Sequence, residues 1–143
     1  MSRREPPPDV PVISPSLAGA FVLVVEDKDD ARTLLATLLT LYGAQVTAVS
    51  SVREAVSCFE RVTPDIVVSD IHMPEEDGFD LIRWLRALPP ERGGNTPAVA
   101  VTAFYAPGDR EQILEAGYQE HLAKPVEIEN LIVMLARVLG RAR

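Results

Sequence analysis

Short apolar runs alternate with longer amphipathic segments from Phe21 to the end of the chain. A short, continuous apolar run is typical of a strand in a parallel sheet that is covered on both faces. Such runs lie at residues 21–25, 66–69 and 98–101, with a weaker strand predicted at 45–49 and a last short strand that reaches Lys124. The pattern therefore predicts five strands.

The segments between these runs carry helix signals. Asp29 or Asp30 is placed to cap the first helix, and Ser51 with Glu54 three residues later has the pattern of a capping box at the second. The remaining helices are predicted at residues 79–88, from Asp109 to Gly117 and at 127–139. Because parallel strands need crossover helices, five strand–helix units predict an α/β fold with a doubly wound parallel sheet.

The beginning of the chain has a different composition. Its first sixteen residues include Pro6, Pro7, Pro8, Pro11 and Pro15. Proline at this density favours extended or disordered chain. We therefore predict a flexible leader or linker at residues 1–19, one folded domain at 20–140 and a short tail at 141–143.

Composition narrows the function classes. With 143 residues, 47% of them hydrophobic and 24% charged, the chain can bury the core of one globular domain. No apolar run approaches the ~20 residues that span a bilayer, so no membrane insertion is expected. A single cysteine, Cys58, suits a reducing cytoplasm. The net charge of −7 argues against nucleic-acid binding, which needs a basic surface.

Polar residues interrupt the chain where the predicted strands end. Glu26 and Asp27 follow the first strand, Asp70 ends the third, Thr102 ends the fourth and Lys124 ends the fifth. In open α/β sheets, ligands bind outside the carboxyl ends of the strands, where the winding reverses. We therefore expect these five side chains to converge on one crevice.

The chemistry of such a crevice follows from its residue types. Three crowded carboxylates need a counter-cation, and Mg²⁺ prefers oxygen ligands, with Mn²⁺ as an alternative. A carboxylate beside this metal can attack phosphorus and form an acyl phosphate, a reaction that needs mainly positioning and charge neutralisation. Lys124 would bind one phosphoryl oxygen, while the Thr102 hydroxyl and the backbone N–H of Ala103 would bind others.

Four segments together resemble the receiver domains of response regulators in two-component signalling, over residues 20–139. They are Val24-Val25-Glu26-Asp27, Asp70-Ile71-His72-Met73-Pro74 with Asp77-Gly78, Val101-Thr102-Ala103 and Lys124-Pro125. The resemblance implies a flavodoxin-like (βα)5 fold with strand order 2-1-3-4-5. It also implies that Asp70 accepts a phosphoryl group from a phosphohistidine of a sensor kinase or phosphotransfer protein, and that the domain then changes conformation to relay the signal.

The resemblance assigns the other site residues as well. The Mg²⁺ ligands would be Glu26, Asp27, Asp70 and the backbone carbonyl of His72, with Glu26 acting through water or directly. Thr102 and Lys124 would bind the phosphoryl group, and the Lys124–Pro125 peptide bond would be cis. A domain of this kind promotes its own phosphorylation and dephosphorylation but turns over no separate substrate.

Three residues lie just outside this set. His72 and Phe104 are placed over the pocket mouth, where we expect them to set the lifetime of the phosphoryl group. His121 stands where the family commonly has Tyr or Phe. Either Thr102 moves toward the phosphoryl group and His121 fills the vacated space, or His121 is a half-exposed surface residue.

Partner surfaces are predicted on two helices. The adjacent leucine pairs Leu34/Leu35 and Leu38/Leu39 favour docking of a histidine kinase or histidine phosphotransfer domain on the first helix. The last helix is apolar around more than one face at 131–135. Either a flanking helix covers it, or it forms a homodimer or docking surface.

Two other function classes use similar residues. A haloacid-dehalogenase-type phosphatase would need a second Asp two positions after the nucleophile, where this chain has His72. A pseudo-receiver that binds partners without phosphorylation would not need the complete residue set. The segment Leu17-Ala18-Gly19 favours the C-terminal receiver of a hybrid histidine kinase over a stand-alone receiver.

Overall fold

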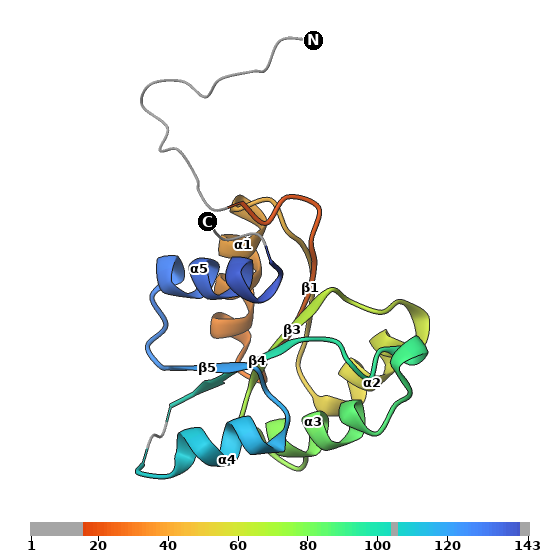
Figure 1. Cartoon of the computed structure of the whole chain (residues 1–143). Coiled ribbons are helices and arrows are strands. Elements are labelled where there is room, and N and C mark those ends of the chain that lie inside the picture. The colour runs from red at the N-terminus through yellow and green to blue at the C-terminus, as the bar shows by residue number, and fades with distance from the viewer. Residues whose placement is uncertain (1–15, 104–105, 141–143) are drawn as a thin grey trace, which may run out of the picture.

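The computed structural model describes residues 16–103 and 106–140. Its five strands form one parallel sheet in the order β2-β1-β3-β4-β5 (Figure 1). The strands are β1 (Phe21–Val25), β2 (Gln45–Val49), β3 (Ile66–Asp70), β4 (Ala98–Thr102) and β5 (Glu120–Ala123). The predicted flavodoxin-like (βα)5 fold and its strand order are confirmed.

Helices cover both faces of this sheet (Figure 1). They are α1 (Asp29–Leu41), α2 (Val52–Arg61), α3 (Gly78–Arg86), α4 (Asp109–Ala116) and α5 (Ile128–Val138), with a short 3-10 helix, η1 (Pro90–Arg92). Helices α1 and α5 pack on one face, and α2, α3 and α4 pack on the other. The three central strands are therefore buried on both sides, which is why their sequences are continuously apolar.

The chain joins the core earlier than its composition suggests. Leu17 is fully buried beside α1 and α5, and its backbone N–H donates to the carbonyl of Tyr42 at 2.9 Å. Residues 16–20 are thus part of the packed structure, although the proline-based boundary assigned 1–19 to a leader. Burying a leucine in this way stabilises the folded chain by about 1.5–3 kcal/mol. This contribution holds Leu17 against the core even though the residues before it are rich in proline.

Helix starts differ from the predicted ones. Lys28, not Asp29 or Asp30, is the N-cap of α1, and no side chain caps that helix. Gly108 is the N-cap of α4, so Asp109 is its first helical residue and accepts a hydrogen bond from the Ala106 N–H at 2.7 Å. These acidic residues therefore lie within the first turn, where they still complement the helix dipole.

The capping boxes also differ. Ser51 accepts from the Glu54 N–H at 3.1 Å as predicted, but the Glu54 carboxylate accepts from Ser50 instead of Ser51. A complete capping box occurs at α3, where Asp77 accepts from the Asp80 N–H and Asp80 accepts from the Asp77 N–H. It fixes the start of α3 directly after the loop that follows β3.

Helix α5 is covered by the core. Leu131, Ile132 and Leu135 are buried in the cluster that also contains α1, whereas Val133 remains exposed. Most of the apolar surface that the sequence shows on this helix therefore belongs to the interior. None of the helices in the described part of the chain is long and apolar enough to cross a membrane.

Candidate phosphorylation and metal site

The five polar side chains predicted at strand ends come from the carboxyl edge of the sheet. Glu26 and Asp27 follow β1, Asp70 and Thr102 are the last residues of β3 and β4, and Lys124 follows β5. Strands β1 and β3 are neighbours at the point where the winding reverses. This is the position at which open α/β sheets bind ligands.

Three carboxylates meet there. One carboxylate oxygen from each of Glu26, Asp27 and Asp70 lies within 4.8 Å of the others. Glu26 and Asp70 are only 1% and 4% exposed. Their crowding in a buried position means that a cation is needed to offset their repulsion.

Lys124 supplies part of that positive charge. Its Nζ lies 2.9 Å from Glu26 Oε1 and 3.3 Å from Asp70 Oδ2. Burial by itself would lower the pKa of Lys124, but the hydrogen bond to Glu26 and the charge of Asp70 outweigh it, so the pKa is raised. The lysine is therefore a firmly charged ammonium beside Asp70. The Lys124–Pro125 peptide bond is cis.

One carboxylate oxygen in the cluster has no partner. Asp27 Oδ1 is buried and makes no hydrogen bond within the described residues. A buried carboxylate oxygen without a donor is costly, and a bound cation would relieve that cost. The donor set is all oxygen, so the residues present fit a hard divalent ion such as Mg²⁺.

Backbone contacts hold the acidic loop in place. The Lys28 N–H donates to Glu26 Oε2 at 3.1 Å. Arg32 Nη1 donates to the backbone carbonyl of Glu26 at 2.9 Å, and Nη2 forms an ion pair with Asp29. The sequence alone did not assign a role to Arg32. An arginine in the first turn of a helix that begins just after an acidic run could have indicated one.

Of the remaining predicted residues, Thr102, Ala103 and His72 lie next to the cluster. Thr102 is 1% exposed, and its carbonyl accepts from the Lys124 N–H at 2.8 Å. Ala103 and His72 are exposed at the edge of the site, and the His72 N–H donates to Asp70 Oδ1 at 3.3 Å. His121 lies half-buried on β5. Phe104 lies outside the described residues.

The acidic cluster opens onto a groove of about 600 Å³. Glu26, Asp70 and Lys124 line its polar end. Most of the larger apolar side chains that line the rest come from α1, from the segment between β5 and α5 and from the start of α5: Leu34, Leu35, Leu38, Pro125, Val126 and Ile128. Leu34 is 59% exposed, so part of this apolar surface faces solvent. The site thus joins a charged pocket to an apolar groove.

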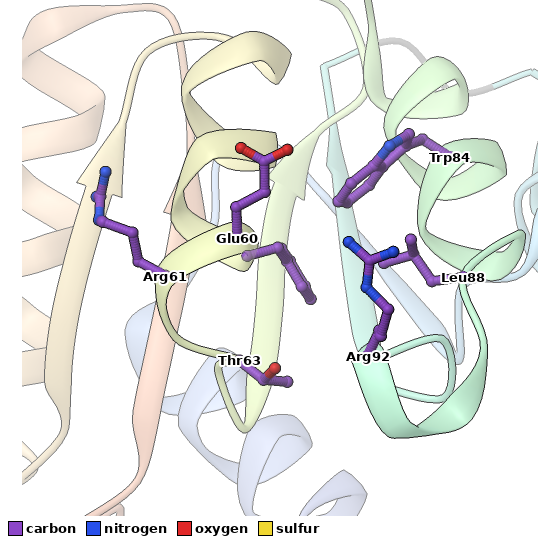
Figure 2. Close-up of a pocket in the computed structure, with 7 residues that line it drawn as sticks. Glu60, Arg61, Thr63, Trp84, Leu88 and Arg92 are labelled. Carbon is purple, nitrogen blue, oxygen red and sulfur yellow. The ribbon is translucent and has the colours of Figure 1, made fainter.

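A second cavity of about 210 Å³ lies between the C-terminal ends of α2 and α3 (Figure 2). Trp84 lines it and packs edge-on against Phe59, with ring centroids 5.6 Å apart. Figure 2 shows Arg61 pointing away from Trp84 and Arg92. Glu60 is the single carboxylate in this lining, so the cavity does not offer the oxygen ligands found at the strand ends.

Comparison with known proteins agrees with this geometry. The family model of the response regulator receiver domain matches residues 22–136. An uncharacterised 14.6 kDa protein of Leptolyngbya boryana is 44% identical over 117 residues, which cover 82% of this chain and 88% of that protein. The polar-differentiation response regulator DivK of Brucella ovis is 31% identical over 121 residues, covering 85% and 97%.

Solved structures give the same result. The receiver domain of a sensor histidine kinase from Pseudomonas aeruginosa PAO1, with a magnesium ion coordinated in its active-site cleft, is 36% identical with a TM-score of 0.77, covering 86% of this chain and 99% of that one. A histidine kinase receiver domain from Syntrophus aciditrophicus is 32% identical with the same TM-score, covering 85% and 91%. The chain belongs to the response regulator receiver domain family.

Proposed function

We propose that Asp70 is the phosphoacceptor of this receiver domain and takes its phosphoryl group from a phosphohistidine. The observation that carries the proposal is the meeting of three carboxylates and one lysine ammonium at the carboxyl edge of the sheet. Asp70 is the member of this set that contacts Lys124 and also accepts from the His72 N–H. Each oxygen of the Asp70 carboxylate therefore accepts a hydrogen bond, and the two bonds together fix its orientation.

Glu26, Asp27 and Asp70 would hold Mg²⁺, or Mn²⁺, together with the backbone carbonyl of His72. The all-oxygen ligand set and the unpartnered Asp27 Oδ1 support this assignment. When bound, the cation neutralises negative charge on the phosphoryl oxygens during transfer.

The chain's own residues carry the rest of the transfer. An Asp70 carboxylate oxygen attacks phosphorus and forms a new O–P bond, while the N–P bond to the donor imidazole breaks and its electron pair returns to the nitrogen. Lys124 lies beside Asp70 Oδ2 and can bind a phosphoryl oxygen there. The Thr102 hydroxyl and the Ala103 N–H would bind the other oxygens. Asp70 takes one phosphoryl group, with no separate turnover substrate.

The groove next to the site suits a protein partner that docks through an apolar surface. Its apolar lining from α1 and the β5–α5 segment suits a histidine kinase or histidine phosphotransfer domain that presents its phosphohistidine to Asp70. Exposed Leu34 would then be covered in the complex.

The direct test is chemical phosphorylation. Incubation with acetyl phosphate and Mg²⁺ should add one phosphoryl group to the protein, measured as intact mass, and the adduct should be absent from Asp70→Asn. Asp30→Asn, an exposed carboxylate near the site, should be labelled like the wild type. A wild-type protein that gains no mass, or an adduct that persists in Asp70→Asn, would overturn the proposal. Release of many phosphates per protein would favour a phosphatase instead.

Thr102 and His121 form the proposed switch. Ala100 pairs with His121 and Thr102 with Ala123 in the sheet, so Thr102 and His121 project from the same face. Movement of Thr102 toward a phosphoryl group would open space on that face for His121. We propose that His72, which is exposed at the mouth, and Phe104 set the lifetime of the phosphoryl group.

His121→Ala should weaken the conformational response without blocking phosphorylation. The measurement is the change in backbone amide chemical shifts of Glu120–Ala123 on phosphorylation, compared at equal extents of modification. We expect the shifts to fall to less than about half of the wild-type values, because Thr102 would lose the group that follows it. Glu120→Gln on the same strand is the control. Shifts equal to those of the wild type would make His121 a passive surface residue.

A further inference from the structure

A buried tyrosine hydroxyl lies beneath the phosphorylation site. Tyr118 is 3% exposed, and its hydroxyl donates to the backbone carbonyl of Gly78 at 2.7 Å. Burial raises the pKa of Tyr118, so the group remains a protonated donor. Phenylalanine would fill the same space without burying a hydroxyl, which costs free energy unless it is hydrogen-bonded. The hydroxyl contacts with the Gly78 carbonyl and with the Ser69 side chain are therefore what tyrosine adds over phenylalanine at this position.

Gly78 is in direct contact with the backbone of Asp70. A Cβ on Gly78 would lie 2.6 Å from the Asp70 carbonyl oxygen, so only glycine fits. The Gly78 N–H donates to the Ile71 carbonyl at 2.9 Å, and the Ser69 hydroxyl donates to the Asp70 carbonyl at 2.9 Å. These contacts close the Asp70–Gly78 loop at its base, where Tyr118 is attached.

The other end of Tyr118 is equally constrained. Its neighbour Gly117 accepts from Arg86 Nε at 3.0 Å and from Arg86 Nη2 at 2.8 Å. Gln119, on its other side, donates its N–H to the Ala98 carbonyl at 2.8 Å and accepts from the Ala98 N–H at 2.7 Å. The turn between α4 and β5 is thus fixed to the C-terminal end of α3 and to β4, so it cannot easily absorb a displacement of Tyr118.

We propose that Tyr118 is a positioning residue that couples the Asp70–Gly78 loop to the α4–β5 turn, residues 117–119. A change in the state of Asp70 that moves Gly78 is transmitted through the Tyr118 hydroxyl to this turn. Coupling between two sites is reciprocal, so the turn also positions the loop. The transmission half of the proposal rests on the proposed role of Asp70; the positioning half does not.

Hydrogen exchange tests the positioning half without any ligand. In Tyr118→Phe, the Gly78 amide should exchange roughly fivefold faster relative to the Val24 amide of β1, which reports on global unfolding. Tyr42 is half-buried, and its hydroxyl makes no hydrogen bond within the described residues. Tyr42→Phe should therefore leave the ratio of the Gly78 and Val24 exchange rates unchanged. Equal acceleration of Gly78 and Val24 in Tyr118→Phe would mean that the hydroxyl is merely structural and would overturn the proposal.

Beryllofluoride with Mg²⁺, an analogue of the aspartyl phosphate, tests transmission. At equal occupancy, the chemical-shift change of the Gly117 and Gln119 amides should fall to less than about half in Tyr118→Phe and remain at the wild-type value in Tyr42→Phe. A full response in Tyr118→Phe would overturn transmission. If acetyl phosphate fails to label the wild type, the proposed function fails, and the exchange ratio still decides whether Tyr118 positions the loop.

A measurement on the unsubstituted fold covers the case in which Tyr118→Phe does not fold. With 3-fluorotyrosine in place of tyrosine, the ¹⁹F resonance of position 118 should shift on addition of beryllofluoride and Mg²⁺, while that of position 42 should not. Tyr42→Phe assigns the resonance of position 42, and Tyr105→Phe separates the other two. A resonance of position 118 that stays in place would contradict the proposal.

Discussion

Replacing Asp27 by Asn should stabilise the protein in the absence of divalent cations and remove the stabilisation that Mg²⁺ gives to the wild type. Three carboxylates share one pocket with a single lysine ammonium, and Asp27 Oδ1 has no donor within the described residues. An Asn amide removes one negative charge and brings two N–H donors toward Glu26 and Asp70. The variant relieves repulsion by the same change that deletes a metal ligand.

The two effects have opposite signs and are measured together. Without metal, Asp27→Asn should gain about 1 kcal/mol in the free energy of unfolding, because it removes the repulsion between like charges in the pocket. At a Mg²⁺ concentration of 100 times its dissociation constant, the wild type should gain about 2.7 kcal/mol, or roughly 8 °C in melting temperature at about 3 °C per kcal/mol. The variant should gain almost nothing from Mg²⁺.

Thermal unfolding with EDTA and with Mg²⁺ provides the comparison. Asp30→Asn, which removes an exposed carboxylate close by, should keep the full Mg²⁺ shift. A variant at position 27 that is less stable than the wild type in EDTA would show that the carboxylate is satisfied in the native protein. A retained Mg²⁺ shift would show that the ion binds elsewhere.

Much of the site was predictable because it depends on local order along the chain. Strands with continuous apolar sequence were found within one residue of their ends, and Glu26, Asp27, Asp70, Thr102 and Lys124 follow from those ends. In a parallel sheet, a residue at the carboxyl end of a strand is brought to the same edge whatever the details of packing. The roles assigned to those residues remain proposals, tested by the experiments above.

Features that depend on contacts distant in sequence were not predictable. Leu17 packs on α1 and α5 although a proline-rich segment precedes it in the sequence, and the Tyr118 hydroxyl reaches a carbonyl 40 residues away. The sequence did not predict Lys28 and Gly108 as the N-caps of α1 and α4, because the aspartates that follow them are the residue type that usually caps a helix. Contacts such as those of Leu17 and Tyr118 depend on tertiary packing, which a local sequence pattern does not contain.

Arg86 is the strongest example, and its replacement by Ala should cost about 3–5 kcal/mol of unfolding free energy. Its half-buried guanidinium donates to the carbonyls of Gly94, Thr96 and Gly117 and to the Gln119 side chain. It makes no salt bridge within the described residues, and burial lowers the pKa of Arg86. The backbone thus replaces water around this cation.

Removal of Arg86 leaves carbonyl groups of two separate connections without their donor. Gly94 is buried and cannot carry a side chain, since a Cβ there would lie 1.9 Å from the Leu88 carbonyl oxygen. Its segment therefore cannot readily turn its carbonyl toward solvent. Urea unfolding of Arg86→Ala should show a lower midpoint with an unchanged slope, since the native fold is weakened but not remodelled.

Two variants separate this role from a general effect of charge. Arg83→Ala on the same helix removes an exposed ion pair with Asp80 and should cost less than about 1 kcal/mol. Arg86→Lys keeps the charge but offers three donors in place of the planar fork, so it should recover only part of the loss. If Arg86→Lys were as stable as the wild type, charge alone would account for the effect. If Arg86→Ala cost no more than Arg83→Ala, the carbonyl contacts would contribute nothing, and the attachment of the α4–β5 turn to α3 would have to lie in apolar packing.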